Sequence, residues 1–411
     1  MTILANLNPA QQAELTAAVT AAGGDGVARL GSPLQNVTPG CFNRYLAARA
    51  AVRAGTGGGL IGFTGTSLML GFAAGDATNN LVRPRAPNVR VADALNRMGI
   101  PASSQGFMGN GFADATSATM QFYDNRITVS GGWAPASTVG MSAGGFFARS
   151  QAAGTLSFAF TGAVDRLNIY EVQTNGYTAG TYSVDIDGTT VISATESTTN
   201  NANNILKKIR SFTAVGSGAH VLNINWISGG VGILGVELYS STSPTIRCLN
   251  MGIGASTSTQ WASTLLPGPT NTVALTVNPD LIIDENAAND WLNGVPLDTY
   301  TANTTTRLSK FQTGSPQCDV IGMTPFPSAN APAGGFSQFA PRATQQLYVD
   351  AYIGVCVSLG IPYIDAWRKI GSWESMNILG KPVFVNDGVH PNSRGAWKYP
   401  DLIAAALASI V

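Results

Sequence analysis

The stretch GGGLIGFTGTSLMLG, residues 57–71, passes from a glycine-rich break through a short apolar run into a segment with helical character. The run LIGF predicts a strand, and Ser67 then falls at a strand-to-helix turn. Beyond residue 244, helical segments alternate with four more apolar runs: IRCLNM, LIID, DVIGM and PYIDA. This alternation is typical of βαβ units, so we predict an α/β domain built on a parallel sheet.

Between residues 111 and 243 the hydrophobic period changes to two. Apolar and polar residues alternate in TLSFAF, RLNIYEV, TYSVDIDGTTV, AHVLNINWI and VGILGVELY, and Asp187-Gly188 is a hairpin signal. We therefore predict an antiparallel β-sandwich inserted into the α/β domain, since a long insertion adds little loop-closure entropy. The predicted organisation is a helical N-terminal segment, 1–55, an α/β domain in two pieces, 56–110 and 244–411, and the insertion, 111–243.

Charged residues make up only 11% of the chain, and 23 Lys and Arg balance 23 Asp and Glu. This composition offers no electrostatic attraction to nucleic acid or to an anionic membrane, so neither is expected as a partner. No apolar run reaches the roughly 18 residues that a membrane span needs. The N-terminal residues do not have the pattern of a secretory signal, so we expect a soluble protein that reaches the outside of a cell, if at all, by another route.

The four cysteines, Cys41, Cys248, Cys318 and Cys356, are far apart and form no CxxC or Cys/His group. A zinc site is therefore unsupported, and the cysteines are best interpreted as small buried hydrophobic residues. We expect neither a metal nor another cofactor.

Three polar positions follow predicted strands or precede the last helix. Ser67 comes after LIGF, Asn289 lies five residues after LIID, and His390 lies in a loop three residues after Asp387. In an α/β sheet, reactive side chains collect beyond the C-terminal ends of the strands. A neutral histidine can take a proton from a serine hydroxyl if a carboxylate orients the imidazole, so Ser67, His390 and Asp387 could form a hydrolase triad.

Four segments resemble, in order, the conserved blocks of the SGNH (GDSL) hydrolases. GFTGTSLMLG resembles the GDS block, NMGIGAST the glycine block, DENAAND the GxND block and DGVHPN the DxxHPN block. The resemblance covers roughly residues 56–110 and 244–411 and leaves out the insertion. It implies a flavodoxin-like fold, with a five-stranded parallel sheet flanked by helices. It also implies Ser67 as nucleophile, His390 as general base and then acid, and Asp387 as the orienting carboxylate.

The same resemblance implies an oxyanion hole made of three donors. These are the backbone N–H of Ser67, a backbone N–H of the glycine block at Gly254 or alternatively Ala255, and the side-chain amide of Asn289. Two positions depart from the family pattern. Thr66 replaces the aspartate of GDS, which removes a carboxylate there, and Ala287 replaces the glycine of GxND.

Structural interpretations of these residues remain open at this point. Ser67 could cap the following helix, Asp387 and His390 could form a surface loop pair, Asn289 could be a turn residue and Asp290 an N-cap. His220, the second histidine, shares a strand face with apolar residues and is expected to be packed or at a rim. Sandwich aromatics could stack on sugars or simply fill the core. They are Trp133, Trp226, Tyr170, Tyr177 and Tyr182.

The resemblance implies a cofactor-free ester hydrolase that works through an acyl-serine. We expect an O-acetylesterase acting on a carbohydrate, because the predicted insertion resembles carbohydrate-binding jelly rolls. One alternative is a lipase- or thioesterase-like enzyme for longer acyl groups, and another is a polysaccharide-binding adhesin with an inactive scaffold. A charge-poor chain rich in Thr, Asn and Gly would also suit a virion surface, where phage-tail proteins of this type would form homo-oligomers such as trimers.

Overall fold

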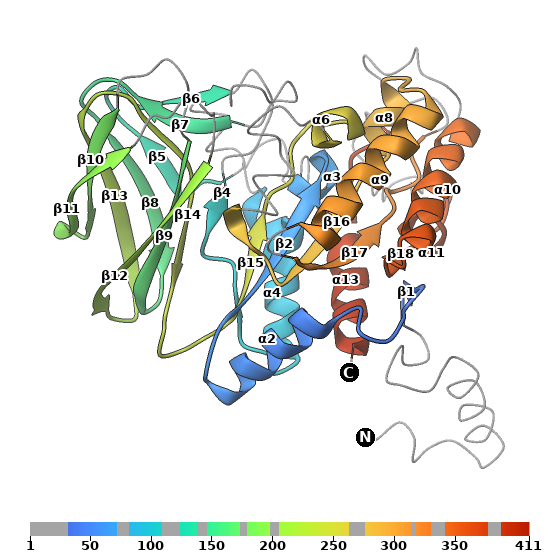
Figure 1. Ribbon diagram of the computed structural model, residues 1–411, viewed down its shortest axis with the longest axis horizontal. Helices are drawn as coiled ribbons and strands as arrows, with labels where there is room; N and C mark the ends of the chain where they lie inside the picture. The colour runs from blue at the N-terminus through green and yellow to red at the C-terminus, as the bar shows by residue number, and fades with distance from the viewer. Residues whose placement is uncertain are drawn as a thin grey trace.

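The computed structural model shows two units side by side, a β-rich unit and an α/β unit (Figure 1). The structure describes residues 32–71, 82–108, 124–137, 146–172, 179–197, 205–262, 276–314, 317–329, 342–376 and 388–410. Within these ranges, none of the helices combines the length and the apolarity that crossing a bilayer requires. The helix predicted at residues 9–22 lies outside the described residues.

The α/β unit is built on a seven-stranded sheet in the order β1-β18-β17-β16-β2-β15-β3. Its strands are β1 Leu34–Gln35, β2 Gly59–Gly65, β3 Ala102–Ser103, β15 Ile246–Asn250, β16 Leu281–Glu285, β17 Asp319–Met323 and β18 Tyr363–Ile364. All neighbours pair in parallel except β1, which is antiparallel to β18. The prediction of a five-stranded parallel sheet was therefore wrong at the two edges, where it lacked β1 and β3. β1 and β3 have two residues each, too few to show a hydrophobic period.

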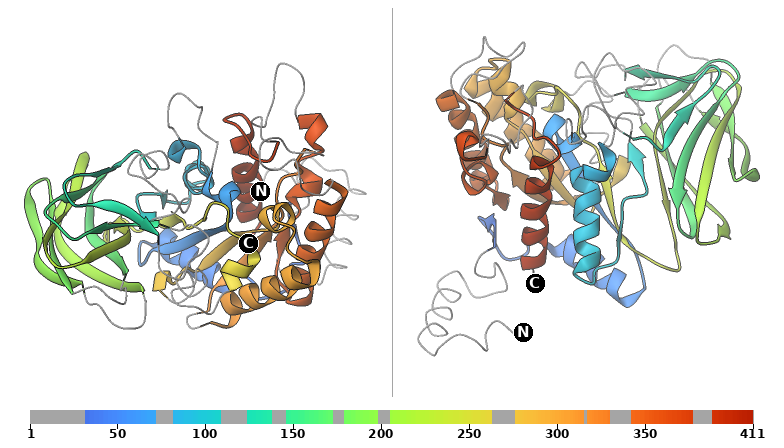
Figure 2. Two further views of the ribbon diagram at one scale, coloured as in Figure 1. Left: turned by 90° about the horizontal axis from the view of Figure 1, so that it is seen from above. Right: turned by 180° about the vertical axis from the view of Figure 1, so that it is seen from behind.

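Helices cover both faces of this sheet. Along β2, Ile61 and Phe63 face one cluster and Leu60 faces the other, which explains the continuous apolar run. Helices α2 Asn43–Ala54, α4 Pro87–Arg97 and α13 Lys398–Ser409 pack on the first face, and α9 Leu297–Thr313 and α10 Arg342–Ser358 on the second. Figure 2 shows α4 and α13 lying side by side. The shorter helices are α3 Ser67–Leu70, α6 Ser258–Ala262, α8 Ala288–Leu292, α11 Ala366–Lys369 and α12 Trp373–Met376, with 3₁₀ turns Arg83–Arg85 and Gly395–Trp397.

The β-rich unit consists of two antiparallel sheets. One has the order β11-β10-β13-β8-β5 and the other β12-β9-β14-β7-β6, with β4 paired to β14. The strands are β4 Phe107–Met108, β5 Ile127–Val129, β6 Ala134–Ser137, β7 Phe146–Ser150, β8 Thr155–Thr161, β9 Val164–Val172, β10 Gly180–Ile186, β11 Thr189–Ser197, β12 Ile205–Val215, β13 Ala219–Ser228 and β14 Val231–Tyr239. Asp187 and Gly188, with φ of 51° and 78°, form the predicted hairpin turn. The jelly-roll connectivity and the exact domain boundaries stay predictions.

The two units share a hydrophobic core. Tyr170 and Val172 of β9 and Leu234 of β14 belong to the same buried cluster as Leu249 and Met251 of the α/β unit. This contact explains why β14 is buried on both faces, although its sequence was interpreted as a half-buried strand. The sandwich is therefore fused to the α/β unit by packed side chains, and removing it would expose apolar surface.

Core packing accounts for three of the sandwich aromatics. Trp133, Tyr170 and Tyr182 are at most 3% exposed, so they cannot stack on a bound sugar. Trp226 is half-buried against the sandwich core, and Tyr177 lies outside the described residues. The cysteines are all free thiols. Cys248, Cys318 and Cys356 are buried as expected, whereas Cys41 is only partly covered.

Candidate active site

Ser67 begins α3 directly after β2, at the C-terminal edge of the parallel sheet. The residue that caps this helix is Thr66, whose hydroxyl oxygen accepts a hydrogen bond from the backbone N–H of Leu68 at 3.3 Å. The interpretation of Ser67 as a helix cap is therefore wrong. With Thr66 in the capping role, the hydroxyl of Ser67 is left for another partner.

Two glycines make this turn tight enough to bring its neighbours close. Gly65 has a φ of 135°, and a β-carbon there would lie 2.1 Å from the carbonyl oxygen of Glu285. A β-carbon on Gly252, in the loop after β15, would lie 2.6 Å from the backbone nitrogen of Leu70. Both positions require glycine, and both bring a neighbouring strand end against the turn that carries Ser67.

His390 meets Ser67 from the other end of the chain. The distance between Ser67 Oγ and His390 Nε2 is 2.7 Å, although the two residues are 323 positions apart. His390 is 6% exposed, so the interpretation as a surface loop residue is wrong. Its loop is anchored where the backbone N–H of Ala329 donates to the carbonyl oxygen of Gly388 at 2.8 Å. Asp387 lies outside the described residues, and its role as orienter of Nδ1 stays a prediction.

The candidate oxyanion donors lie on neighbouring loops of the same edge. The side-chain nitrogen of Asn289, in the first turn of α8, donates to the carbonyl oxygen of Ser256 at 2.9 Å. This bond holds Asn289 against the glycine-block loop and uses one of its two amide hydrogens. In that loop Gly254 is buried, whereas Ala255 is exposed with a φ of 59°. The choice between the N–H groups of Gly254 and Ala255 stays open.

Asp290 performs a task that the sequence did not reveal. Both of its carboxylate oxygens accept from the backbone N–H of Ser258, at 3.0 and 2.9 Å, and one accepts from the Ser258 hydroxyl at 2.6 Å. The N-cap of its own helix is Ala287, so the interpretation of Asp290 as that N-cap is wrong. Asp290 instead holds the start of α6 and so fixes the loop that Asn289 contacts. Burial raises the pKa of this carboxyl, an effect that its bonds to Ser258 oppose.

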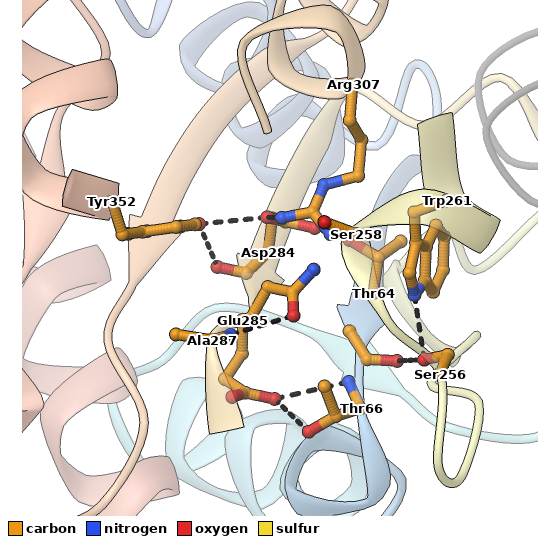
Figure 3. A network of polar contacts seen from close by, with 12 residues as sticks. Thr64, Thr66, Ser256, Ser258, Trp261, Asp284, Glu285, Ala287, Arg307 and Tyr352 are labelled. Carbon is orange, nitrogen blue, oxygen red and sulfur yellow. Dashed lines mark hydrogen bonds and ion pairs between the residues drawn. The ribbon is translucent and has the colours of Figure 1, made fainter. Parts of the chain in front are cut away.

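A buried polar network lies beneath this edge (Figure 3). The Asp284 carboxylate accepts from the Thr64 hydroxyl at 2.9 Å, from Arg307 Nη2 at 2.8 Å and from the Tyr352 hydroxyl at 2.8 Å. Asp284 and Arg307 are both 0% exposed. The network ties β2, β16, α9 and α10 together below Ser67 and His390. An acidic residue closing the apolar run LIID was a usable sequence signal for it.

Glu285 approaches the Ser67 turn directly. The backbone N–H and the hydroxyl of Thr66 donate to Glu285 Oε2 at 3.2 and 2.6 Å (Figure 3). Burial raises the pKa of this carboxyl to about 7, against the opposing effect of the bonds from Thr66. A carboxyl group from the next strand therefore reaches the position where the family pattern carries aspartate and this chain carries Thr66. Sequence spacing could not reveal this, because the pairing depends on strand order.

Residues 211–398 match the model of the GDSL-like lipase/acylhydrolase family. This segment, less than half of the chain, is similar to a GDSL-like lipase/acylhydrolase domain. The matched range includes Asn289 and His390, begins within β12 and does not reach Ser67. Ser67 lies outside the matched residues, and the structure places its Oγ 2.7 Å from Nε2 of His390, which lies inside them. The family is one of ester hydrolases.

Three solved structures can be compared with this chain, and of these the first superposes well enough to show a shared fold. A structure of a peptidoglycan O-acetylesterase superposes with a TM-score of 0.64 at 14% identity and covers 92% of this chain and 98% of its own. A Bacillus subtilis protein covers 74% of this chain and 98% of its own, with 11% identity and a TM-score of 0.34. A salicylyl-acyltransferase from a tetracycline biosynthetic pathway covers 69% and 95%, with 13% identity and a TM-score of 0.32. Among curated protein sequences, none matches this chain.

Proposed function

We propose that this protein is a serine O-acetylesterase that removes acetyl groups from a carbohydrate. The observation that carries the proposal is the buried 2.7 Å contact between Ser67 Oγ and His390 Nε2 at the C-terminal edge of the sheet. A serine hydroxyl is a weak nucleophile until an adjacent base takes its proton, and a histidine nitrogen within hydrogen-bond reach is such a base.

In the proposed reaction Ser67 Oγ attacks the acetyl carbonyl carbon while its proton passes to His390 Nε2. The tetrahedral intermediate collapses when the bond between the acetyl carbonyl carbon and the sugar oxygen breaks, and the imidazolium gives the proton to the departing sugar oxygen. Water then attacks the acetyl-serine, with His390 again as base, and acetate is released. Asp387 would stabilise the imidazolium from the Nδ1 side.

The developing oxyanion needs donors that are already in place. The backbone N–H of Ser67, one N–H of the loop at Gly254 or Ala255, and the second amide hydrogen of Asn289 are the proposed set. Asn289 is held by its 2.9 Å bond to Ser256, so little reorganisation would be required during the reaction. Removing one such donor costs about 10²- to 10³-fold in kcat in well-studied hydrolases.

Two observations support an acetylated carbohydrate as substrate. A β-sandwich is packed against the α/β unit through a shared core, which would keep a polymer-binding surface at a fixed place beside the reaction. The fold also extends over 92% of this chain in a structure named as a peptidoglycan O-acetylesterase. The acetyl group and the carbohydrate remain proposals, because that likeness concerns the fold.

The test is acetate release from a panel of O-acetylated polysaccharides, peptidoglycan among them. The wild-type protein should release acetate from at least one polymer, Ser67→Ala should release none, and His220→Ala should match the wild type. A strong preference for octanoyl over acetyl p-nitrophenyl esters would overturn the acetyl assignment in favour of a lipase-like enzyme. Binding to polymer without hydrolysis of any ester would overturn the enzymatic proposal in favour of an adhesin.

A further inference from the structure

Glu285 is a buried carboxyl group that the proposed reaction leaves without a task. It ends β16, is 0% exposed and lies opposite Gly65 in the parallel register with β2. Only Oε2 is engaged, by the N–H and the hydroxyl of Thr66. Within the described residues, Oε1 has no hydrogen-bond partner. Burying a carboxyl in this way is costly, so its presence calls for a function.

The bonds of Glu285 lead into the turn that carries the nucleophile. The Thr66 hydroxyl donates its hydrogen to Glu285. This bond leaves the lone pairs of the Thr66 hydroxyl oxygen directed towards the backbone N–H of Leu68. Thr66 is thereby fixed on its backbone and on its side chain at once. Ser67 lies between the two bonded residues, so the position of its Oγ depends on the relay from Glu285 through Thr66 to Leu68.

The groups around Glu285 do not turn it into an ordinary ion pair. Asp284 precedes it on β16, the Tyr399 hydroxyl of α13 donates to the carbonyl oxygen of Thr324 at 3.1 Å, and Arg307 of α9 forms its ion pair with Asp284 at 2.8 Å. The donors that reach Glu285 are therefore the neutral groups of Thr66. If Glu285 formed a salt bridge, its burial could be explained by the stability of the fold alone. The hydrogen bonds from Thr66 instead connect Glu285 to the turn that carries Ser67.

We propose that Glu285 is a positioning residue that acts through Thr66 to hold Ser67 Oγ in line with His390 Nε2. It touches neither substrate nor reacting atoms. The inference rests on the proposed function, since it assumes that Ser67 is the nucleophile. It gives a carboxyl group from β16 the task of ordering the nucleophile turn in a chain that has Thr66 in place of the GDS aspartate.

The test measures how fast a fluorophosphonate probe labels Ser67, because this reaction reports the nucleophile independently of any ester. Glu285→Leu leaves both Thr66 donors unpaired and should slow labelling about 10²-fold, the cost of a small misplacement of a reacting group. Glu285→Gln keeps an acceptor oxygen and should lose less than about tenfold. The matched control is Glu237→Gln, the same change at a buried carboxyl of the sandwich, which should label at the wild-type rate.

A double-mutant cycle separates positioning from general stability. If Glu285 acts through Thr66, then Thr66→Val combined with Glu285→Leu should label no more slowly than Glu285→Leu alone. If the fold-losses in labelling rate of the two single variants multiply in the double variant, Glu285 does not act through Thr66 and the positioning role is overturned. Equal labelling rates of wild type and Glu285→Leu would overturn it as well. Either result would leave Ser67 as the nucleophile. A wild-type protein that the probe does not label at Ser67 would overturn the proposed function and this inference together.

Discussion

Carboxyl groups are buried both in the β-sandwich and at the edge of the α/β sheet, but their partners differ. On the sandwich strands, Glu171 lies 2.8 Å from Lys208, and Glu237 lies 3.3 Å from Arg247 of β15 in the α/β unit. A tyrosine hydroxyl also donates to each of these glutamates. Glu285 at the sheet edge is bonded by Thr66 alone among the described residues. The same residue type, equally buried, thus serves as half of an ion pair in one region and contacts the turn that carries Ser67 in the other.

The pKa values of Glu237 and Glu285 differ in direction, whereas burial raises the pKa of Glu171 despite its bonds from Lys208 and Tyr182. Burial alone would raise the pKa of Glu237, but Arg247 and the bonds from Tyr170 and Asn168 outweigh it and lower the pKa below its ordinary value. For Glu285, burial prevails over the bonds from Thr66 and raises the pKa to about 7. The comparison indicates that Arg247 stabilises the charged form of Glu237, whereas Glu285 can be neutral or charged near neutral pH.

The largest expected effect separates the two histidines. His390→Ala should lower kcat for acetate release by at least about 10³-fold, because the base for Ser67 is lost. His220 bonds to Asp187 at 2.6 Å and to the carbonyl oxygen of Gly216 at 2.9 Å in the sandwich, so His220→Ala should leave kcat unchanged. Steady-state assays of both variants check this. Equal losses of kcat in the two variants would mean that the histidine at the sheet edge matters no more for the reaction than the histidine in the sandwich.

The next effect tests the ionic partner of a sandwich carboxylate. Arg247→Met should lower the free energy of unfolding by about 3–5 kcal/mol, because it leaves Glu237 charged, buried and unpaired. Urea denaturation measures this loss, and kcat of the folded variant should stay close to wild type. The double variant Arg247→Met/Glu237→Gln should recover most of the stability. A loss below about 1 kcal/mol in the single variant would show that the pair is not needed.

Glu285 should give a stability that depends on pH. Its pKa is about 7 in the folded protein and 4.5 in the reference state, so from pH 4.5 to 7 the folded protein keeps a proton that the unfolded chain has released. Stability from this group is present below pH 4.5 and is lost as the pH rises through 7, by about 3 kcal/mol in total. Glu285→Gln cannot ionise and should escape this loss. The free energy of unfolding of Glu285→Gln minus that of wild type should therefore rise between pH 5 and pH 7 and stay constant above pH 7.

Urea denaturation of both proteins at pH 5, 6, 7 and 8 tests the pH dependence. Glu237→Gln is the matched control, and it should show no gain over the same interval because the pKa of Glu237 is lowered. A difference between Glu285→Gln and wild type that stays constant with pH would mean that Glu285 does not titrate there.

Residue patterns predicted the elements of this fold that have a clear hydrophobic period. β8, β9, β13 and β14 lie where alternation placed them, and the parallel strands β15 to β18 lie at the apolar runs. β12 was missed because Lys207, Lys208 and Arg210 interrupt its alternation. The full burial of β14 could not be predicted either, since it comes from packing between the two units.

The candidate site was predictable wherever one residue carries its own signal. Ser67 follows a strand, His390 is one of two histidines, and the structure brings these two together. The supporting residues could not be found in this way. Glu285 and Thr66 are 219 positions apart, and Asp290 and Ser258 are 32 apart, so their contacts depend on strand order and loop shape. Asp387 and the choice between Gly254 and Ala255 stay predictions.

The smallest expected effect concerns backbone strain, which the two regions also handle differently. In the sandwich, a positive φ falls on Asp187, a residue type that tolerates the left-handed region in turns. At the sheet edge, a φ of 127° falls on Ala287, where the family pattern has glycine. That region is populated almost only by glycine, and the strain of another residue there is about 1–3 kcal/mol.

Ala287→Gly should therefore raise the free energy of unfolding by about 1 kcal/mol, after about 0.5–1 kcal/mol is subtracted for the extra entropy of glycine in the unfolded chain. The matched control is the neighbouring Ala288→Gly, inside α8, which should lower stability by about 1 kcal/mol because its backbone is helical. Denaturation of the two variants side by side measures both changes. If both lower stability equally, Ala287 is unstrained and its departure from the family pattern has no energetic cost. Opposite signs would place the strain at Ala287, two residues before Asn289, where the proposed reaction requires a rigid backbone.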